Sequence, residues 1–427
     1  MIVEFSMQNF RSIKDLQTIS FVATGLKSPN GSEEIDEGNI AEKSSMKLLK
    51  TVGIYGANGS GKSNIIRGLE YFLNTISREA SSESKLFSLC DPFLYQKDSS
   101  FSESYFQIVL IVNDKKFRYG FTVKVNPVKP KDPDDKYSKE IITSEWLYGT
   151  KGKNLVKYFI RKNNEIEDDT LPNKEKIPKL SYQHTLFLTH CAAFDSEGDI
   201  ASIKNYLKGW TLSNFTSGTS PFRWNTIYLI EREKRKKDFI ELLAAFNLNY
   251  NDIIIEKDPE KPDPKTVPQD KIIMVKNYYL NDEELKVRLN LSKNESSGTK
   301  KLFDLAGLLL RAFNLDKSAF IILDEIDSNF HPSLLIKLIE LFNNKRLNKS
   351  NCQLLFSSHD TNLMDPKVMR RDQFYFTEKT EENSTRVYSL ADLKGIRNDA
   401  DFAKQYLAGY YGAIPQLHNY EKNNGND

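Results

Sequence analysis

One segment constrains the fold more than any other: Gly56–Ser63 reads GANGSGKS, which matches the pattern GxxxxGK[ST]. The apolar run Leu48–Tyr55 before it is typical of a strand, and apolar residues recur at helical spacing between Lys62 and Ile76. Glycines at these positions let backbone N–H groups close around phosphate oxygens, and the positive end of the following helix adds attraction. The segment therefore predicts a phosphate-binding loop between a strand and a helix.

Side-chain chemistry predicts the roles within this loop. We expect Lys62 to contact the β- and γ-phosphates of ATP and Ser63 to be a ligand of Mg²⁺. Other residues of the segment would contribute further contacts to the nucleotide. They are Gly56, Ala57, Asn58, Gly59, Ser60, Gly61 and Asn64.

Two acidic residues follow a second apolar run, Phe320–Leu323. A carboxylate at the end of a buried strand is what a phosphate-loop enzyme needs near Mg²⁺, so we expect Asp324 to be a metal ligand. Glu325, one residue further on, would be the general base that polarises the attacking water. Without the phosphate loop, the same letters would describe a strand followed by an acidic turn.

A histidine, His359, ends the next predicted strand, Leu354–Ser357, within the letters SSHD. If that strand lies beside the Asp324 strand, His359 can contact the γ-phosphate. A satisfied surface histidine is the alternative interpretation.

Small residues begin a predicted helix shortly before the Asp324 strand. They are Ser296, Ser297 and Gly298, and the helix is expected to run to about residue 313. A helix start of this kind favours a second anion site, although an ordinary helix N-cap explains the same local sequence.

Composition bears on partners and compartment. Lys and Arg number 60 against 58 Asp and Glu, a net charge of +2, so binding of nucleic acid is unsupported by overall charge. The basic run Lys234–Lys237 is interleaved with acids and is more simply a solvated helix face. The three cysteines lie far apart, which argues against a zinc site and indicates a reducing compartment. No apolar run approaches the roughly 18 residues of a membrane span. We therefore expect a cytoplasmic protein without membrane contact.

The order of phosphate loop, Ser-Gly helix start, Asp-Glu strand and His strand end resembles the heads of ABC-type ATPases. That group includes the structural-maintenance-of-chromosomes, RecF and overcoming-lysogenization-defect proteins. The resemblance implies that two protomers sandwich two ATP molecules, either in a head-to-head dimer or in a higher homo-oligomer. The signature motif that contacts the partner's ATP would be Ser296, Ser297 and Gly298.

The same resemblance implies further roles. His359 would be the switch histidine, and Asp327-Ser328 would lie in the D-loop. The N-terminal Asn9-Phe10-Arg11-Ser12 would bring Arg11 near nucleotide or DNA. The signature departs from LSGGQ, because Ser297 and Thr299 stand where Gly and Gln are usual.

A narrower resemblance is to the RloA and abortive-infection ATPases of phage defence, which are related to the overcoming-lysogenization-defect group. It rests on GANGSGKSN, Glu145–Tyr148, LDEIDSNFHP, SSHD and Tyr406–Pro415. It implies a sensor or regulatory ATPase that controls a separate effector protein such as a nuclease. The stretch after His359 is too short for a TOPRIM nuclease domain, so we expect the nuclease on another chain.

The expected architecture is α/β, an ABC-type P-loop ATPase head with an inserted helical arm. Its parallel sheet would be flanked by helices, with an antiparallel β lobe that includes a hairpin at 105–125. Residues 1–190 would form the N-terminal part of the head, 191–285 the helical insertion, and 286–427 the C-terminal part. The alternative function is a RecF-like DNA-repair ATPase. An AAA+ remodeller or P-loop kinase is a third reading, disfavoured by the histidine and the Ser-Gly helix start.

Overall fold

The computed structural model describes most of the chain, and the statements below concern the described residues. These are residues 1–77, 89–96, 102–126, 140–152, 154–168, 170–180, 183–195, 197–208, 211–214, 222–256, 271–281, 283–314, 319–328 and 330–415. Within them, no helix is long and apolar enough to cross a bilayer.

A six-stranded sheet lies at the centre of the fold, in the order β11-β15-β16-β5-β17-β18. The first five strands are parallel, and only the edge strand β18 is antiparallel to its neighbour. Every residue of β5, β15 and β16 is buried, as expected of a parallel sheet covered on both faces. The predicted parallel sheet is thus confirmed. The strands are β5 (Thr51–Gly56), β11 (Thr211–Asn214), β15 (Phe320–Asp324), β16 (Gln353–Ser357), β17 (Phe374–Lys379) and β18 (Thr385–Ser389).

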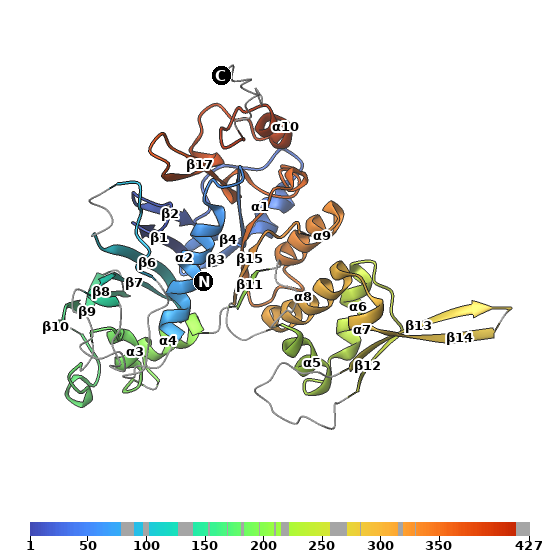
Figure 1. The fold of residues 1–427 in the computed structure, drawn as a ribbon, viewed down its shortest axis with the longest axis horizontal. Coiled ribbons are helices and arrows are strands. Elements are labelled where there is room, and N and C mark those ends of the chain that lie inside the picture. The colour runs from blue at the N-terminus through green and yellow to red at the C-terminus, as the bar shows by residue number, and fades with distance from the viewer. Residues whose placement is uncertain are drawn as a thin grey trace, which may run out of the picture.

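A seven-stranded antiparallel sheet forms the second lobe, on the left in Figure 1, in the order β10-β9-β8-β7-β6-β1-β2. The predicted hairpin is confirmed, because β6 and β7 pair around Asn113-Asp114. Both turn residues have positive φ, the backbone that a two-residue hairpin turn requires. The strands are β1 (Ile2–Gln8), β2 (Gln17–Ser20), β6 (Ser104–Val112), β7 (Lys115–Val125), β8 (Glu140–Lys151), β9 (Asn154–Lys162) and β10 (Glu165–Asp168).

The helix α2 (Lys62–Ser77) joins the two sheets in one hydrophobic core. Its buried face contributes Ile65, Leu69 and Phe72 to this core. The Phe72 ring stacks on Phe121 of β7 at 5.2 Å between centroids. The helix that follows the phosphate-binding loop is therefore fixed against both lobes.

A second core lies on the other face of the central sheet, around α8 (Ser297–Phe313) and α9 (Pro332–Asn343). The helices α5 (Arg223–Glu231) and α6 (Lys236–Ala245) belong to it as well, because Leu229 and Leu243 are fully buried there. The remaining helices are α1 (Glu33–Asn39), α3 (Phe187–Ala192), α4 (Asp199–Lys208), α7 (Leu291–Asn294) and α10 (Phe402–Leu407).

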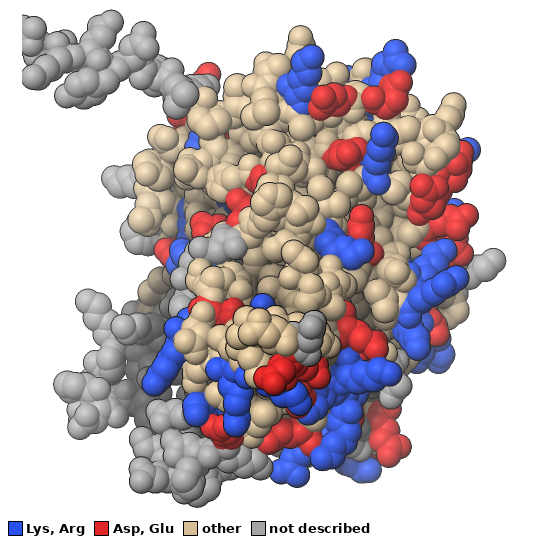
Figure 2. Space-filling model, turned by 90° about the vertical axis from the view of Figure 1, so that its right-hand side faces the viewer, with Lys and Arg blue, Asp and Glu red and all other residues tan. Residues whose placement is uncertain are grey.

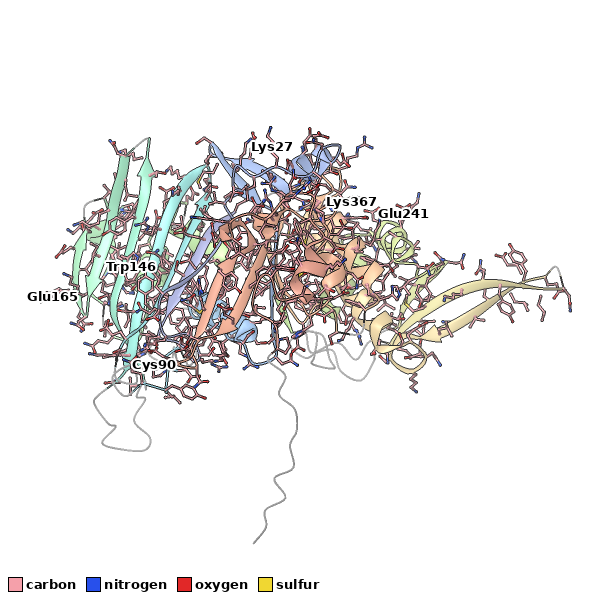
Figure 3. All side chains as sticks on the ribbon, turned by 90° about the horizontal axis from the view of Figure 1, so that it is seen from above. Lys27, Cys90, Trp146, Glu165, Glu241 and Lys367 are labelled. Carbon is pink, nitrogen blue, oxygen red and sulfur yellow. The ribbon has the colours of Figure 1, made fainter. Side chains whose placement is uncertain are left out.

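Residues 191–285, expected as an inserted helical arm, contain strands as well as helices. β11 pairs with β15 in the central sheet, and α4 packs against α2. A separate three-stranded sheet is formed by β12 (Asp252–Glu256), β13 (Lys271–Leu280) and β14 (Glu283–Asn290). The β13–β14 hairpin extends away from the body, as Figures 1 and 3 show. Residues 257–270 lie outside the described residues, and the domain boundaries stay a prediction.

A buried carboxylate organises the outer part of the antiparallel lobe. Glu145 of β8 is fully buried and accepts hydrogen bonds from the backbone N–H groups of Phe187 (2.6 Å) and Leu188 (2.8 Å) at the start of α3. It also accepts from Tyr119 Oη (3.0 Å) and from Arg161, which is itself fully buried. Glu145 therefore has a structural role in joining α3 to three strands.

We expect Glu145→Ala to lower the free energy of unfolding by about 3–5 kcal/mol, because it leaves the Arg161 guanidinium buried without its counter-charge. Glu165→Ala, on the exposed edge strand β10, should change it by less than about 0.5 kcal/mol. Urea unfolding of both variants measures the difference. Equal losses in the two variants would contradict this role for Glu145.

Candidate nucleotide-binding site

The loop between β5 and α2 fits closely against the two strands beyond it. Gly61 has φ +114°, and a Cβ there would lie 2.2 Å from Thr385 Oγ1 of β18. A Cβ at Gly56 would lie 2.3 Å from the carbonyl oxygen of Thr377 on β17. Side chains are excluded at both positions, so the glycines are required by the fold of the loop.

Hydroxyl groups from distant parts of the chain support the loop. Ser60 Oγ and Thr377 Oγ1 are hydrogen-bonded at 2.6 Å. Thr385 Oγ1 lies 2.8 Å from both the Ser60 carbonyl oxygen and Ser12 Oγ. The amide of Asn64, in the first turn of α2, donates to Ser12 Oγ at 2.8 Å. Sequence reasoning missed the support from Ser12, Thr377 and Thr385, because no local pattern links residues so far apart.

Lys62 rests on the loop that it follows. Its Nζ donates to the carbonyl oxygens of Gly56 (2.8 Å) and Ala57 (3.0 Å), and the side chain is buried. Burial lowers the pKa of Lys62 to about 8, against the opposing effect of Asp324 and its acidic neighbours. The ammonium group is thus held by two carbonyl oxygens of the loop.

The pKa of Lys62 predicts how ATP affinity depends on pH. Phosphates bound beside Lys62 would raise its pKa above the value of about 8 in the free protein, so binding takes up a proton at higher pH. ATP affinity should therefore fall as pH rises above about 8, by at most about tenfold per pH unit. In Lys62→Arg the charge persists, so affinity should stay flat. Calorimetric titrations between about pH 7 and 9.5 measure this, and identical profiles for the two proteins would contradict it.

The acidic pair is held by the neighbouring strand. Asp324 ends β15, is buried, and accepts a hydrogen bond of 2.5 Å from Ser357 Oγ of β16. The same hydroxyl accepts from the backbone N–H of Glu325 at 2.8 Å. Glu325 has φ +51°, an uncommon backbone for a residue with a side chain, and such residues cluster at functional sites. One serine thus fixes both predicted acids.

The histidine lies beside these acids, because its strand is the neighbour of the Asp324 strand, as predicted. β16 pairs with β15 on one side and with β5 on the other, so His359 follows the strand between the acidic pair and the loop. Its backbone N–H donates to Asp327 Oδ1 at 3.3 Å. Burial, and then the charge of Lys62, lower the pKa of His359, while the nearby acids oppose this shift. The imidazole is therefore held mainly neutral near pH 7.

The Ser-Gly helix start forms an N-cap, one of the two interpretations left open. Ser296 Oγ accepts from the backbone N–H of Thr299 at 3.1 Å, and both Ser296 and Ser297 are exposed. One turn further on, Lys301 Nζ contacts the carbonyl (3.3 Å) and hydroxyl (3.4 Å) oxygens of Ser328. Burial lowers the pKa of Lys301, and the negative charge of Glu325 opposes this shift. The start of α8 is thus tied to the acidic turn, a link that sequence reasoning missed.

Arg11 is engaged beside the loop. Its guanidinium pairs with Asp91 (Nε–Oδ2 2.8 Å) and lies over the rings of Phe10 and Tyr71, at 5.5 and 5.7 Å. The adjacent Ser12 makes the contacts to the loop support and to α2. A role for Arg11 in nucleotide binding stays a prediction.

A family model described as "AAA domain, putative AbiEii toxin, Type IV TA system" matches residues 52–365. The chain belongs to this family. The match begins in β5 and ends beyond His359, so it includes the loop, the acidic pair and the histidine. No curated protein matches the sequence significantly.

Membership in this AAA-domain family makes the chain a P-loop ATPase linked to abortive-infection and toxin–antitoxin systems. Such domains generally use ATP and Mg²⁺. Two side chains here are suited to Mg²⁺, Ser63 at the start of α2 and the buried carboxylate Asp324. No group of three or more His, Cys, Asp or Glu that could hold a metal occurs in the described part of the chain. Mg²⁺ usually keeps several waters and binds one or two protein groups plus phosphates.

Proposed function

We propose that this P-loop protein hydrolyses ATP as an ABC-type head of the overcoming-lysogenization-defect and RloA-like group. The observation that carries the proposal is the parallel order β15-β16-β5. It gathers the acidic pair, His359 and Lys62 at one edge of the sheet. The start of α8, where Ser296 and Ser297 are exposed and Lys301 contacts the acidic turn, supports the ABC-type assignment in particular.

Each group has a separate task in the proposed reaction. Lys62 would leave the loop carbonyls and neutralise the β- and γ-phosphates, while Ser63 and Asp324 would hold Mg²⁺, which supplies further positive charge. Glu325 would accept a hydrogen bond from the attacking water and polarise it. His359, neutral near pH 7, would donate an N–H to the γ-phosphate.

Glu325→Gln tests this assignment. The amide keeps the shape of the side chain but removes the base, so ATP binding should persist while turnover falls by about 100-fold or more. ATP-bound dimers or larger assemblies should then accumulate, which light scattering with and without ATP measures. Glu241→Gln, an exposed glutamate on α6, is the control and should turn over normally. Normal turnover in Glu325→Gln would refute the role.

We also propose that the start of α8 completes the site of a second copy. A helix N-terminus with exposed small residues can approach phosphates closely, and a side chain at Gly298 would obstruct this. The departures from LSGGQ at Ser297 and Thr299 leave that approach open, because both are small. His359 and Asp327 would lie at the same interface.

Mixing two inactive variants tests action between protomers. Gly298→Asp and Lys62→Ala should each have little ATPase activity. A heterodimer of the two contains one whole site, so partial activity should return on mixing if one site can act alone. Gly25→Asp, at an exposed glycine with open space around it, is the control for adding an acid. Strong activity of Gly298→Asp alone would contradict action in the partner's site.

In biological terms, we propose a sensor or regulatory subunit that controls a separate effector, such as a nuclease, during phage infection. The family's description, with its toxin and toxin–antitoxin system, supports a second component. The RecF-like alternative requires a DNA-binding surface. On the face drawn in Figure 2, Lys and Arg side chains are interleaved with Asp and Glu, which gives this alternative no support there. Capture of partners by tagged Glu325→Gln from infected cells would separate the two readings. Recovery of DNA without a protein effector would favour the alternative.

A further inference from the structure

A second pocket lies at the opposite end of β5 from the phosphate loop. Its volume is about 430 Å³, and it is formed between α1, the hairpin β3 (Ile40–Lys43) and β4 (Met46–Leu49), and the chain after α9. Lys50 lies in its wall, directly before β5, whereas Gly56 of the loop ends that strand. Six residues of strand put about 20 Å between the two ends. The lining residues are Asp36, Glu37, Ile40, Ala41, Glu42, Lys47, Lys50, Lys345 and Asn351.

Lys50 is the unusual residue of this pocket. Its relative exposure is 0%, and its Nζ has no hydrogen-bond partner in the part of the chain that the structure describes. Its backbone is fixed on both sides, because its N–H donates to Asn39 (2.9 Å) and its carbonyl oxygen accepts from Leu354 (2.8 Å). The side chain therefore cannot be withdrawn by a shift of the backbone. A buried ammonium group without a partner is costly, so such groups are normally paired.

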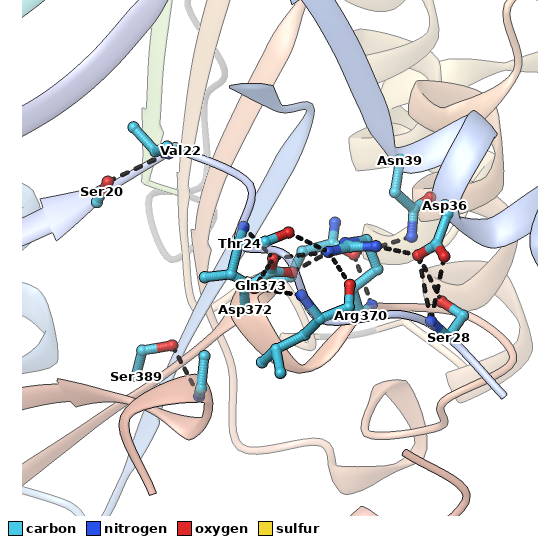
Figure 4. A network of polar contacts seen from close by, with 12 residues as sticks. Ser20, Val22, Thr24, Ser28, Asp36, Asn39, Arg370, Asp372, Gln373 and Ser389 are labelled. Carbon is cyan, nitrogen blue, oxygen red and sulfur yellow. Dashed lines mark hydrogen bonds and ion pairs between the residues drawn. The ribbon is translucent and has the colours of Figure 1, made fainter. Parts of the chain in front are cut away.

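The acids around the pocket are engaged elsewhere or lie at its rim. Asp36 accepts from Ser28 Oγ at 2.9 Å and is paired with Arg370, in the network drawn in Figure 4. The carboxylate of Glu37 lies 4.0 Å from Lys345 Nζ, and that of Glu42 lies 3.8 Å from Lys47 Nζ. Both ion pairs are exposed and their N–O distances are long, so they are weak. None of the three carboxylates is hydrogen-bonded to Lys50.

The neighbouring charge increases the need for an anion at Lys50. Lys345 lies close enough to act on it, and burial together with this positive charge lowers the pKa of Lys50 to about 8. The group is still mainly protonated near pH 7. Lys50 and Lys345 thus line the same cavity, and the side chain of Lys50 is buried in its wall whereas that of Lys345 is exposed.

We propose that this pocket binds a small molecule through one compact anionic group, a phosphate or a carboxylate. Lys50 would be its buried partner, and Lys345 and Lys47 would contact it from the rim. The volume lies within the range of pockets for small ligands. Glu37 and Glu42 at the rim disfavour a second anionic group on the same ligand. The site is separate from the proposed ATP site and does not depend on hydrolysis.

Titration of three probes against Lys50→Met tests the proposal. The probes are inorganic phosphate, AMP and acetate, and the binding of each is measured by titration calorimetry. The protein is first saturated with Mg²⁺ and a non-hydrolysable ATP analogue, so that the phosphate loop is occupied. Phosphate and AMP test for a phosphoryl group, and acetate tests for a carboxylate. Methionine is an unbranched side chain only one atom shorter than lysine and carries no charge, so Lys50→Met should stay folded and bind the ATP analogue normally. Lys349→Met, an exposed lysine outside the lining, is the matched control.

At least one probe should bind the wild type and Lys349→Met with equal affinity. Its dissociation constant for Lys50→Met should be at least about tenfold higher than for the wild type, because a hydrogen bond to a charged group is lost. If Lys50→Met does not fold, Lys345→Met on the exposed rim should weaken the same probe. Equal binding by wild type and the lysine variant used would overturn the proposal. Failure of all three probes to bind the wild type would overturn it as well. Failure of the ATP analogue to bind would instead count against the proposed ATPase site, and the probes can then be titrated without it.

Discussion

Parallel pairing of β15, β16 and β5 is the constraint on which the rest of the site depends. Parallel strands end at the same edge of a sheet, so the residues that follow each strand meet there whatever their separation in sequence. The hydroxyl of Ser357 fixes both acids at this edge, because it donates to the Asp324 carboxylate and accepts from the Glu325 N–H. A slip of β16 by one residue would turn that hydroxyl to the other face and separate the two acids from their support.

Local patterns were enough to predict the loop, the acidic pair and the neighbouring histidine strand. Each of these follows or ends a short apolar run, and a parallel strand has this composition because both of its faces are buried. Their roles in binding and catalysis stay predictions. The supports from Thr377 and Thr385 could not be predicted, because a threonine in a strand has no local feature that distinguishes a loop contact from ordinary packing.

The segment 191–285 was harder to predict for a different reason. The apolar runs Ile253–Ile255 and Ile272–Val275 are rich in β-branched residues and could have indicated strands. The charged residues around Lys234–Lys237 favour a helical interpretation of the segment instead. β11 is only four residues long, and its strand conformation comes from pairing with β15, which no sequence window contains. The predicted strand Leu48–Tyr55 was likewise two strands that meet at Lys50, since β4 pairs with β3 and β5 with the central sheet.

The close packing of α5 on α8 has a mechanical consequence. A Cβ at Gly307 of α8 would lie 2.0 Å from Thr226 Oγ1, and Arg223 pairs with Asp304 at 3.1 Å, so a shift of one helix alone would break these contacts. α7, which leads directly into α8, packs on β13 and carries the hairpin with it. The ten residues of β13 give this hairpin a reach of about 33 Å. A tilt of about 5° at the base of the hairpin would therefore displace its tip by about 3 Å, so any small rotation of α7 and α8 would be largest at the tip.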